Sequence, residues 1–140
     1  MSTVLLINAC ATWYCVGLIW FVQLVAYPQF ARVGADAFSA YHAAHVRWTS
    51  MVVAPVMLVE LITTAALVWM MPSAATWAGV GLLTVVWLNT FAMEVPTHNR
   101  LRDTGFDRAL IAKLVRQNWP RTLAWTARGG LVLWMLAESL

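Results

Sequence analysis

The stretch Glu94-Val95-Pro96-Thr97-His98-Asn99-Arg100 closes a long apolar run and opens the most basic part of the chain. Glu94 and His98 stand four residues apart, so on a helix their side chains share one face. Pro96 lies between them, removes a backbone donor and bends or ends such a helix. We therefore expect the polar side chains of an otherwise apolar protein to gather here, on one side of a membrane.

The composition points to lipid as the solvent. The chain has 140 residues, of which 61% are hydrophobic and 11% are charged, and its mean hydropathy is +0.70. A soluble domain is nearer half apolar and a quarter charged, so a single small core cannot hide this excess. The net charge of +3 rests on few charged residues, and we expect no nucleic-acid partner.

Four stretches have the length of membrane helices, which need about 20 apolar residues. We expect spans over about 4–26, 46–70, 77–95 and 121–138. Apolar residues between Phe106 and Arg116 recur at helical spacing, which predicts an amphipathic helix lying on the membrane surface. The chain 1–140 is therefore predicted to be one all-α transmembrane domain, a four-helix up-down-up-down bundle without a strong internal repeat.

The basic residues predict the orientation of the bundle. All nine lie in or beside the first and third connections, whereas the termini and the second connection have none. Because basic loops stay on the cytoplasmic side, we expect a multi-pass protein of the cell (inner) membrane with both termini outside. These residues are Arg32, Arg47, Arg100, Arg102, Arg108, Lys113, Arg116, Arg121 and Arg128.

Alternating helix directions bring the cytoplasmic ends of the four spans to one depth. Polar and aromatic side chains gather there, and Trp119 and Trp125 are placed to form a wall for a flat lipophilic ligand or a cation-π contact. The candidate ligand-binding residues are Gln23, Tyr27, Asn89, Asn99, Asn118, Trp119 and Trp125.

Two charged residues of the spans need partners. Arg128 lies about 10 Å into the fourth span and should pair inside the bundle. We expect Glu94 as its partner, either as an ion pair that fixes helix register or as part of an anion-binding or proton-transfer site. Glu60 lies too deep to join this layer. Glu60 is either a proton carrier or cavity lining, or a neutral carboxyl group satisfied by Thr63, Thr64 or the backbone.

The histidines allow a metal hypothesis. His42 and His45 are three residues apart on a predicted helix, and His98 shares a face with Glu94. Three imidazoles and a carboxylate suit a transition metal, namely zinc, iron or copper, or a haem. The alternative is that these histidines contact lipid headgroups or cap helix ends.

Two segments carry a resemblance to a known family. They are Val95-Pro96-Thr97-His98-Asn99-Arg100-Leu101 and the run from Asn118-Trp119-Pro120-Arg121-Thr122 to Trp125-Thr126-Ala127-Arg128. Together they resemble the anthrone oxygenase-like group of small four-span membrane proteins, although His98 stands where many members have Asn. The resemblance implies oxygenation of a polycyclic phenolic substrate, carried by Asn99, Asn118, Trp119, Arg121 and Arg128.

We therefore expect a small membrane oxidoreductase or oxygenase that binds a lipophilic aromatic or quinone-like molecule in the cytoplasmic half of the bundle. The histidines would bind metal or exchange protons, the carboxylate would act as base, and the arginines would stabilise negative charge on oxygen. The alternative is a non-catalytic accessory subunit or a small carrier, working as a homo-oligomer through small residues such as Gly129-Gly130. The catalytic candidates are Glu94, His98, Arg121 and Arg128.

Overall fold

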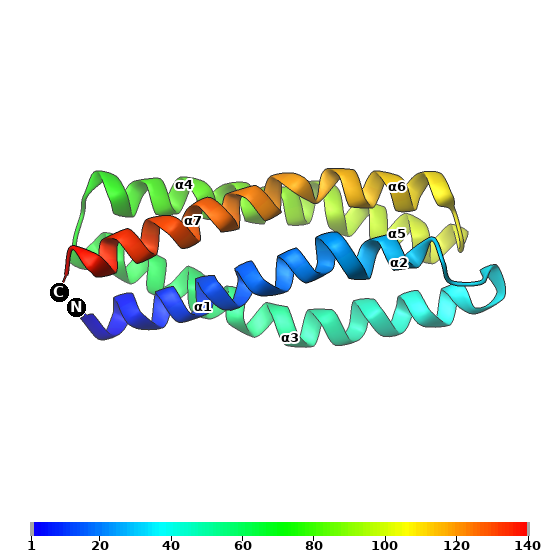
Figure 1. Cartoon of the computed structure of the whole chain (residues 1–140), viewed down its shortest axis with the longest axis horizontal. Helices are drawn as coiled ribbons and strands as arrows, with labels where there is room; N and C mark the ends of the chain where they lie inside the picture. Colours follow the sequence, from blue (N-terminus) through cyan, green and yellow to red (C-terminus); the bar gives the residue numbers. More distant parts are fainter. Residues whose placement is uncertain (1, 140) are drawn as a thin grey trace.

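The protein is a bundle of four helical rods that lie side by side (Figure 1). The computed structural model describes residues 2–139. Each rod except the second consists of more than one helical segment. The rods are α1 (Ser2–Phe21), η1 (Val22–Ala26) and α2 (Tyr27–Phe30); α3 (Ala35–Met70); α4 (Ala74–Asn89), η2 (Thr90–Glu94) and α5 (Val95–Thr104); and α6 (Arg108–Gln117) and α7 (Trp119–Ala137).

The rods alternate in direction, so the predicted all-α up-down-up-down bundle is confirmed (Figure 1). Helix α1 packs along α3 and α7, and α4 packs along α7. Three helical stretches, Thr3–Phe30, Ala35–Met70 and Ala74–Thr104, are long and apolar enough to cross a membrane. The fourth rod lies beside them, and its membrane crossing stays a prediction.

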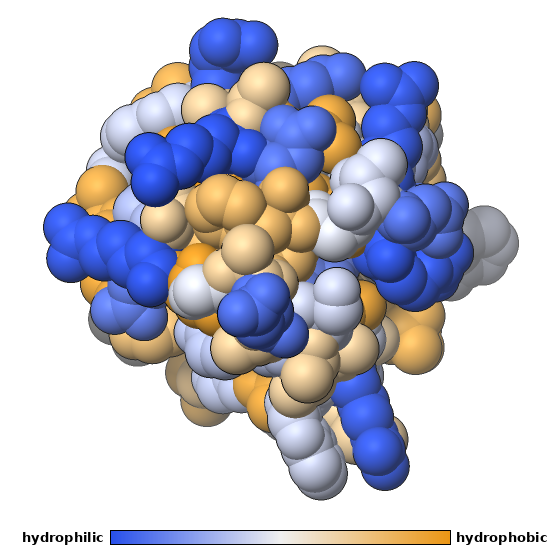
Figure 2. All heavy atoms as spheres, turned by 90° about the vertical axis from the view of Figure 1, so that its right-hand side faces the viewer, coloured by the Kyte–Doolittle hydropathy of each residue, from blue (hydrophilic) through white to orange (hydrophobic). Residues whose placement is uncertain are grey.

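The two ends of the bundle differ in character. Both termini lie at one end, and the connections that follow α2 and α5 lie at the other (Figure 1). We call the second the basic end, because Arg32, Arg47, Arg100, Arg102 and Arg108 are exposed there. Figure 2 views this end and shows hydrophilic side chains around a smaller apolar centre.

The helix boundaries follow local sequence signals. Ser73 begins α4 with a capping box, in which its hydroxyl accepts from the Thr76 amide and Thr76 accepts from the Ser73 amide. Helix α3 begins well before the predicted span 46–70, with Gly34 at its N-cap position. Asn118 separates α6 from α7.

The amphipathic helix is present as α6, and its side chains Ile111 and Leu114 are buried. Its neighbours in the bundle are α2 and α5. The amphipathic pattern predicted a helix flat on the membrane surface, whereas α6 extends in the general direction of α7 and forms one rod with it (Figure 1). Residues of α7 therefore lie farther from the basic end than the predicted fourth span implied.

Two π-helical turns precede prolines at matching places in the first and third rods. The amide of Tyr27 donates to the Val22 carbonyl, and the amide of Val95 donates to the Thr90 carbonyl. Proline cannot donate a backbone hydrogen bond and crowds the preceding turn, and a π turn is a local adjustment of the helix ladder. In each rod the next residue is proline, Pro28 or Pro96.

These turns reveal a repeat that was not predicted from the sequence. The same separation along the chain relates η1 to η2, Pro28 to Pro96, and Glu60 to Arg128. Each half of the chain is thus a helical hairpin with a π turn in its first rod and a charged residue in its second.

The α1–α7 seam is tightly closed. Gly129 permits this approach, because a Cβ atom there would lie 3.2 Å from Val16 and 3.3 Å from Trp13. Gly129 is therefore used within the bundle, and the contact between copies stays a prediction. The α3–α4 seam differs, since two cavities open along it.

Candidate functional site

Arg128 pairs with Glu60 in the middle of the bundle. Its Nε lies 2.8 Å from Oε1 of Glu60, and both side chains are almost wholly buried. The predicted Glu94–Arg128 pair is therefore wrong. The physical reason is depth, because α6 and α7 form one long rod and Arg128 lies beyond the Glu94 layer.

The rest of the Arg128 guanidinium is also hydrogen-bonded. Nη1 donates to the Gly79 carbonyl at 2.7 Å, while Nη2 donates to the Thr64 hydroxyl and to Oδ1 of Asn8 at 3.2 Å. Arg128 on the fourth rod thus bonds to residues on each of the other three rods. Each nitrogen of the guanidinium has an acceptor.

Glu60 is equally well satisfied. Its Oε1 accepts from the Thr12 hydroxyl at 2.8 Å as well as from Arg128, and its Oε2 accepts from the Trp125 indole at 3.0 Å. A buried ion pair is stable only when hydrogen bonds satisfy both charges. We call these side chains, with Asn8 and Thr64, the central network, and its complete pairing favours a structural role.

A second polar cluster joins the first rod to the fourth. Oε1 of Gln23 accepts from Asn118 at 2.9 Å and from Thr122 at 3.2 Å, and Nε2 of Gln23 donates to the Val115 carbonyl at 3.0 Å. Gln23 and Asn118 were predicted to bind a ligand. The structure instead places them against each other, where they connect helices.

The π turn η2 is held by side chains from neighbouring segments. Gln117 donates to the Met93 carbonyl at 2.8 Å and to the Thr97 hydroxyl at 2.7 Å, and Asn89 donates to the Gln117 carbonyl at 3.0 Å. Asn89, a predicted ligand-binding residue, therefore braces the junction between α6 and η2. This bracing positions Glu94, the last residue of the turn.

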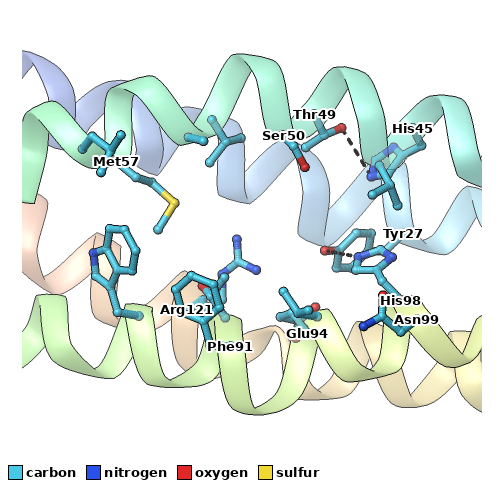
Figure 3. Close-up of a pocket in the computed structure, with 17 residues that line it drawn as sticks. Tyr27, His45, Thr49, Ser50, Met57, Phe91, Glu94, His98, Asn99 and Arg121 are labelled. Atoms are coloured by element: carbon cyan, nitrogen blue, oxygen red, sulfur yellow. Dashed lines mark hydrogen bonds between the residues drawn. The ribbon is translucent and has the colours of Figure 1, made fainter.

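A cavity of about 360 Å³ lies beside Glu94, between α3 and the third rod (Figure 3). Its walls are largely apolar and include Val53, Met57, Trp87 and Phe91. The lining residue Phe91 is 60% exposed. The cavity therefore opens to the outside of the bundle beside this apolar side chain. The polar lining residues are Tyr27, His45, Thr49, Ser50, Thr90, Glu94, His98, Asn99 and Arg121.

Glu94 and Arg121 face this cavity without a hydrogen-bond partner for three key atoms. Both carboxyl oxygens of Glu94 and Nε of Arg121 are buried and unpaired among residues 2–139. The guanidinium of Arg121 lies 5.3 Å from the Trp125 ring centre and points between the helices (Figure 3). Buried polar groups normally have partners, and these two side chains also line a cavity, so a polar group of a ligand could pair with them there.

The histidines at the basic end of the cavity form a chain. Nε2 of His42 lies 2.9 Å from Nδ1 of His98, and Nε2 of His98 lies 3.0 Å from the Tyr27 hydroxyl. His45 stands beside this chain and contacts the Thr49 hydroxyl at 3.5 Å. The chain runs from buried His42 to Tyr27 in the cavity wall, where Glu94 also lies.

The metal prediction finds no support in this arrangement. The part of the chain that the structure describes contains no group of three or more His, Cys, Asp or Glu side chains placed to hold a metal ion. Both ring nitrogens of His98 are engaged, one by His42 and one by Tyr27. Of the predicted set, His42 and His98 are hydrogen-bonded to each other, whereas His45 contacts Thr49 and Glu94 lies in the cavity wall.

Of the remaining predicted site residues, two line the cavity and two do not. Asn99 and Arg121 line the cavity. Trp119 instead packs edge-on against Trp20, with ring centres 5.8 Å apart, and Trp125 is buried against Glu60. The alternative prediction for these tryptophans, a cation-π contact, is present between Trp125 and Arg121. The aromatic wall of the cavity is formed instead by Trp87 and Phe91 of the third rod, whose ring centres lie 5.6 Å apart.

Trp87 was missed because it reads as an ordinary apolar residue of the third span. Its indole nitrogen is buried and unpaired within the described chain. The spacing Trp87–Phe91–Glu94–His98 places these residues on one helix face, and this signal was available in the sequence.

No protein-family model, curated protein or solved structure matches this chain. The resemblance to the anthrone oxygenase-like group therefore stays a prediction.

Proposed function

We propose that this protein is a membrane protein that binds a lipophilic aromatic or quinone-like molecule in the Glu94–Arg121 cavity. The proposal rests on one observation: the oppositely charged side chains of Glu94 and Arg121 line one largely apolar cavity and keep polar atoms without a partner in the described chain. Typical ligand sites are mostly apolar with a few convergent polar groups. With the basic end in the cytoplasm, as the positive-inside rule predicts, the ligand would bind at the depth of the cytoplasmic leaflet.

The two groups select the polar part of the ligand. Arg121 donates hydrogen bonds and Glu94 accepts them when ionised, so together they suit a molecule with a carbonyl or phenolate oxygen and a hydroxyl group. A ring carrying both fits between the stacked Trp87 and Phe91 on one helix and Met57 on the other. The exposed Phe91 and Leu58 at the cavity favour entry from the lipid.

The same residues supply proton transfer. Oxidation of a hydroquinone releases two protons and two electrons. Glu94 would take a proton from the ring hydroxyl, Arg121 would stabilise negative charge on oxygen, and Tyr27, His98 and His42 would pass protons along their hydrogen bonds. We take dioxygen as the oxidant: it would accept the two electrons and two protons and leave as hydrogen peroxide, while the hydroquinone becomes the quinone.

The binding step is tested with the purified protein in lipid nanodiscs. The probe is 2-methyl-1,4-naphthoquinone, and the readout is quenching of tryptophan fluorescence. Glu94→Gln and Arg121→Gln should each weaken binding at least about tenfold, equal to about 1.4 kcal/mol. Asp103→Asn and Arg116→Gln are the matched controls, because both of these residues are exposed and neither lines the cavity.

Two outcomes separate an enzyme from a carrier. If the reduced probe is converted under air at a rate that depends on Glu94, the oxidoreductase function is supported. Specific binding without conversion favours a non-catalytic carrier or accessory subunit. Equal quenching by the wild type and by both cavity variants would overturn the proposed site.

A further inference from the structure

A second cavity of about 400 Å³ continues along the α3–α4 seam. We call it the apolar groove, and its lining includes Leu61, Ala65, Val80 and Leu83. Its two hydroxyl groups are satisfied by their own helices, since Thr84 donates to the Val80 carbonyl at 2.8 Å and Thr64 donates to the Glu60 carbonyl at 2.6 Å. The indole nitrogen left unpaired within the described chain belongs to Trp87, in the wall that the groove shares with the first cavity. The groove thus offers an occupant apolar contact and no free polar group from its two threonines.

The apolar groove and the Glu94–Arg121 cavity share a wall. Trp87 and Phe91 line both, so an elongated molecule can pass along these rings from one space to the other. The spaces also differ in polarity, because the unpaired carboxyl group of Glu94 lines only the first.

Their order along the helix matches the order of groups in an amphiphile. From Glu94 to Val80 the third rod runs away from the basic end for about 21 Å at 1.5 Å per residue. With the basic end in the cytoplasm, the polar cavity lies nearer the membrane surface and the groove lies nearer the bilayer centre. A molecule with a polar head and a hydrocarbon tail has this arrangement in a leaflet.

We infer that the ligand is an amphiphile, in which a hydroxy- or oxo-substituted ring occupies the Glu94–Arg121 cavity and a covalently attached hydrocarbon chain occupies the apolar groove. This inference rests on the proposed function and specifies its ligand class. The opposite seam supports the assignment, because α1 and α7 close around Gly129 with no room for a Cβ without local adjustment. The opening along α3 and α4 is thus not a general property of the bundle.

The test compares two probes that differ only in the tail. One is 2-methyl-1,4-naphthoquinone, and the other carries a decyl chain at the 3-position of the same ring. Affinities in nanodiscs of one phospholipid are expressed per mole fraction of probe in the bilayer, which removes the effect of partitioning. The decyl chain should strengthen binding to the wild type about tenfold.

Ala65→Phe fills the apolar groove without touching the polar cavity, because Ala65 lines only the groove. It should abolish the gain from the tail and leave the affinity for the tailless probe unchanged. Ala78→Phe is the matched control, since Ala78 is also exposed on a helix but lines neither space, and it should preserve the gain.

The failures are distinguishable. If the tailless probe binds in a Glu94-dependent way and the tail adds nothing, the inference is overturned and the proposed function stands. The same holds if Ala65→Phe and Ala78→Phe reduce the gain equally. If neither probe binds the wild type, both the proposed function and this inference are overturned.

Discussion

The bundle uses a carboxyl group and a guanidinium twice, in opposite ways. In the central network, Glu60 and Arg128 lie 2.8 Å apart and every charged atom has a partner. In the cavity, no ion pair within the described residues joins Glu94 to Arg121, and both keep unpaired atoms. The comparison teaches that burial of charge alone does not identify a ligand site. Unpaired polar atoms beside a cavity are the stronger signal, because Asn89 and Asn118 also keep an oxygen unpaired within residues 2–139 but do not line the cavity.

The largest expected effect comes from breaking the central network. Arg128→Leu would leave the Glu60 carboxyl group buried without its cation, which typically costs about 3–5 kcal/mol. We expect a large fall in thermal stability in detergent, measured by loss of the monodisperse peak in size-exclusion chromatography after heating.

A double variant sharpens this prediction. Glu60→Leu together with Arg128→Met removes both charges and should recover much of the lost stability, because apolar replacements of buried pairs are often neutral. Arg116→Leu, at an exposed position, is the control. A double variant no more stable than Arg128→Leu would contradict the ion-pair interpretation.

The second prediction concerns the glycine beside the guanidinium. A Cβ atom at Gly79 would lie 2.8 Å from Nη1 of Arg128, so Gly79→Ala should displace Arg128 and cost about 1–3 kcal/mol. Gly130→Ala meets nothing within 4 Å and should be neutral or stabilising by about 0.5–1 kcal/mol. Thermal unfolding of the two variants, followed by circular dichroism, checks the contrast. Equal melting temperatures would show that the guanidinium can move freely.

The third prediction is that a variant at the cavity loses ligand binding but keeps its stability. Glu94→Gln keeps the shape of the side chain and an oxygen that can accept from the neighbouring Tyr27 hydroxyl, so its melting temperature should stay close to that of the wild type. Its affinity for the naphthoquinone probe should still fall about tenfold. A loss of stability comparable to that of Arg128→Leu would mean that Glu94 is structural.

The smallest effect should come from the end of the histidine chain. Tyr27→Phe removes the hydroxyl that lies 3.0 Å from Nε2 of His98, and loss of one hydrogen bond typically costs about 1 kcal/mol. Probe binding should persist, whereas any turnover of the reduced probe should slow more than binding weakens. Unchanged turnover would remove Tyr27 from the proton path.

Much of the fold was predictable from the sequence. Apolar runs gave the helices, and the distribution of basic residues separated the two ends of the bundle. The polar layer was also partly correct, because Tyr27, His45, Glu94, His98 and Arg121 meet at one cavity. These predictions needed only periodicity and direction, which are local properties of helices.

The partner of Arg128 could not be predicted in the same way. Depth along a rod depends on where the rod begins, and α6 was assigned to the membrane surface rather than to the fourth rod. Asn8 and Thr12 were overlooked because single polar residues in an apolar run do not reveal which neighbour they face. The π turns precede Pro28 and Pro96, which are visible in the sequence. Only the structure shows that Gln117 donates a hydrogen bond to the Met93 carbonyl in the second turn.

The matching positions of Glu60 and Arg128 in the two hairpins have an evolutionary consequence. If the two halves descend from one duplicated hairpin, an ancestor with the same residue in both copies would bring two like charges together at the bundle centre. With Glu60 in the first half and Arg128 in the second, the two halves pair through opposite charges. Two copies of the same half would instead bring like charges together. The chain, cut at the α3–α4 turn, should therefore reassemble from its two fragments as a heterodimer, while neither fragment should form a stable homodimer.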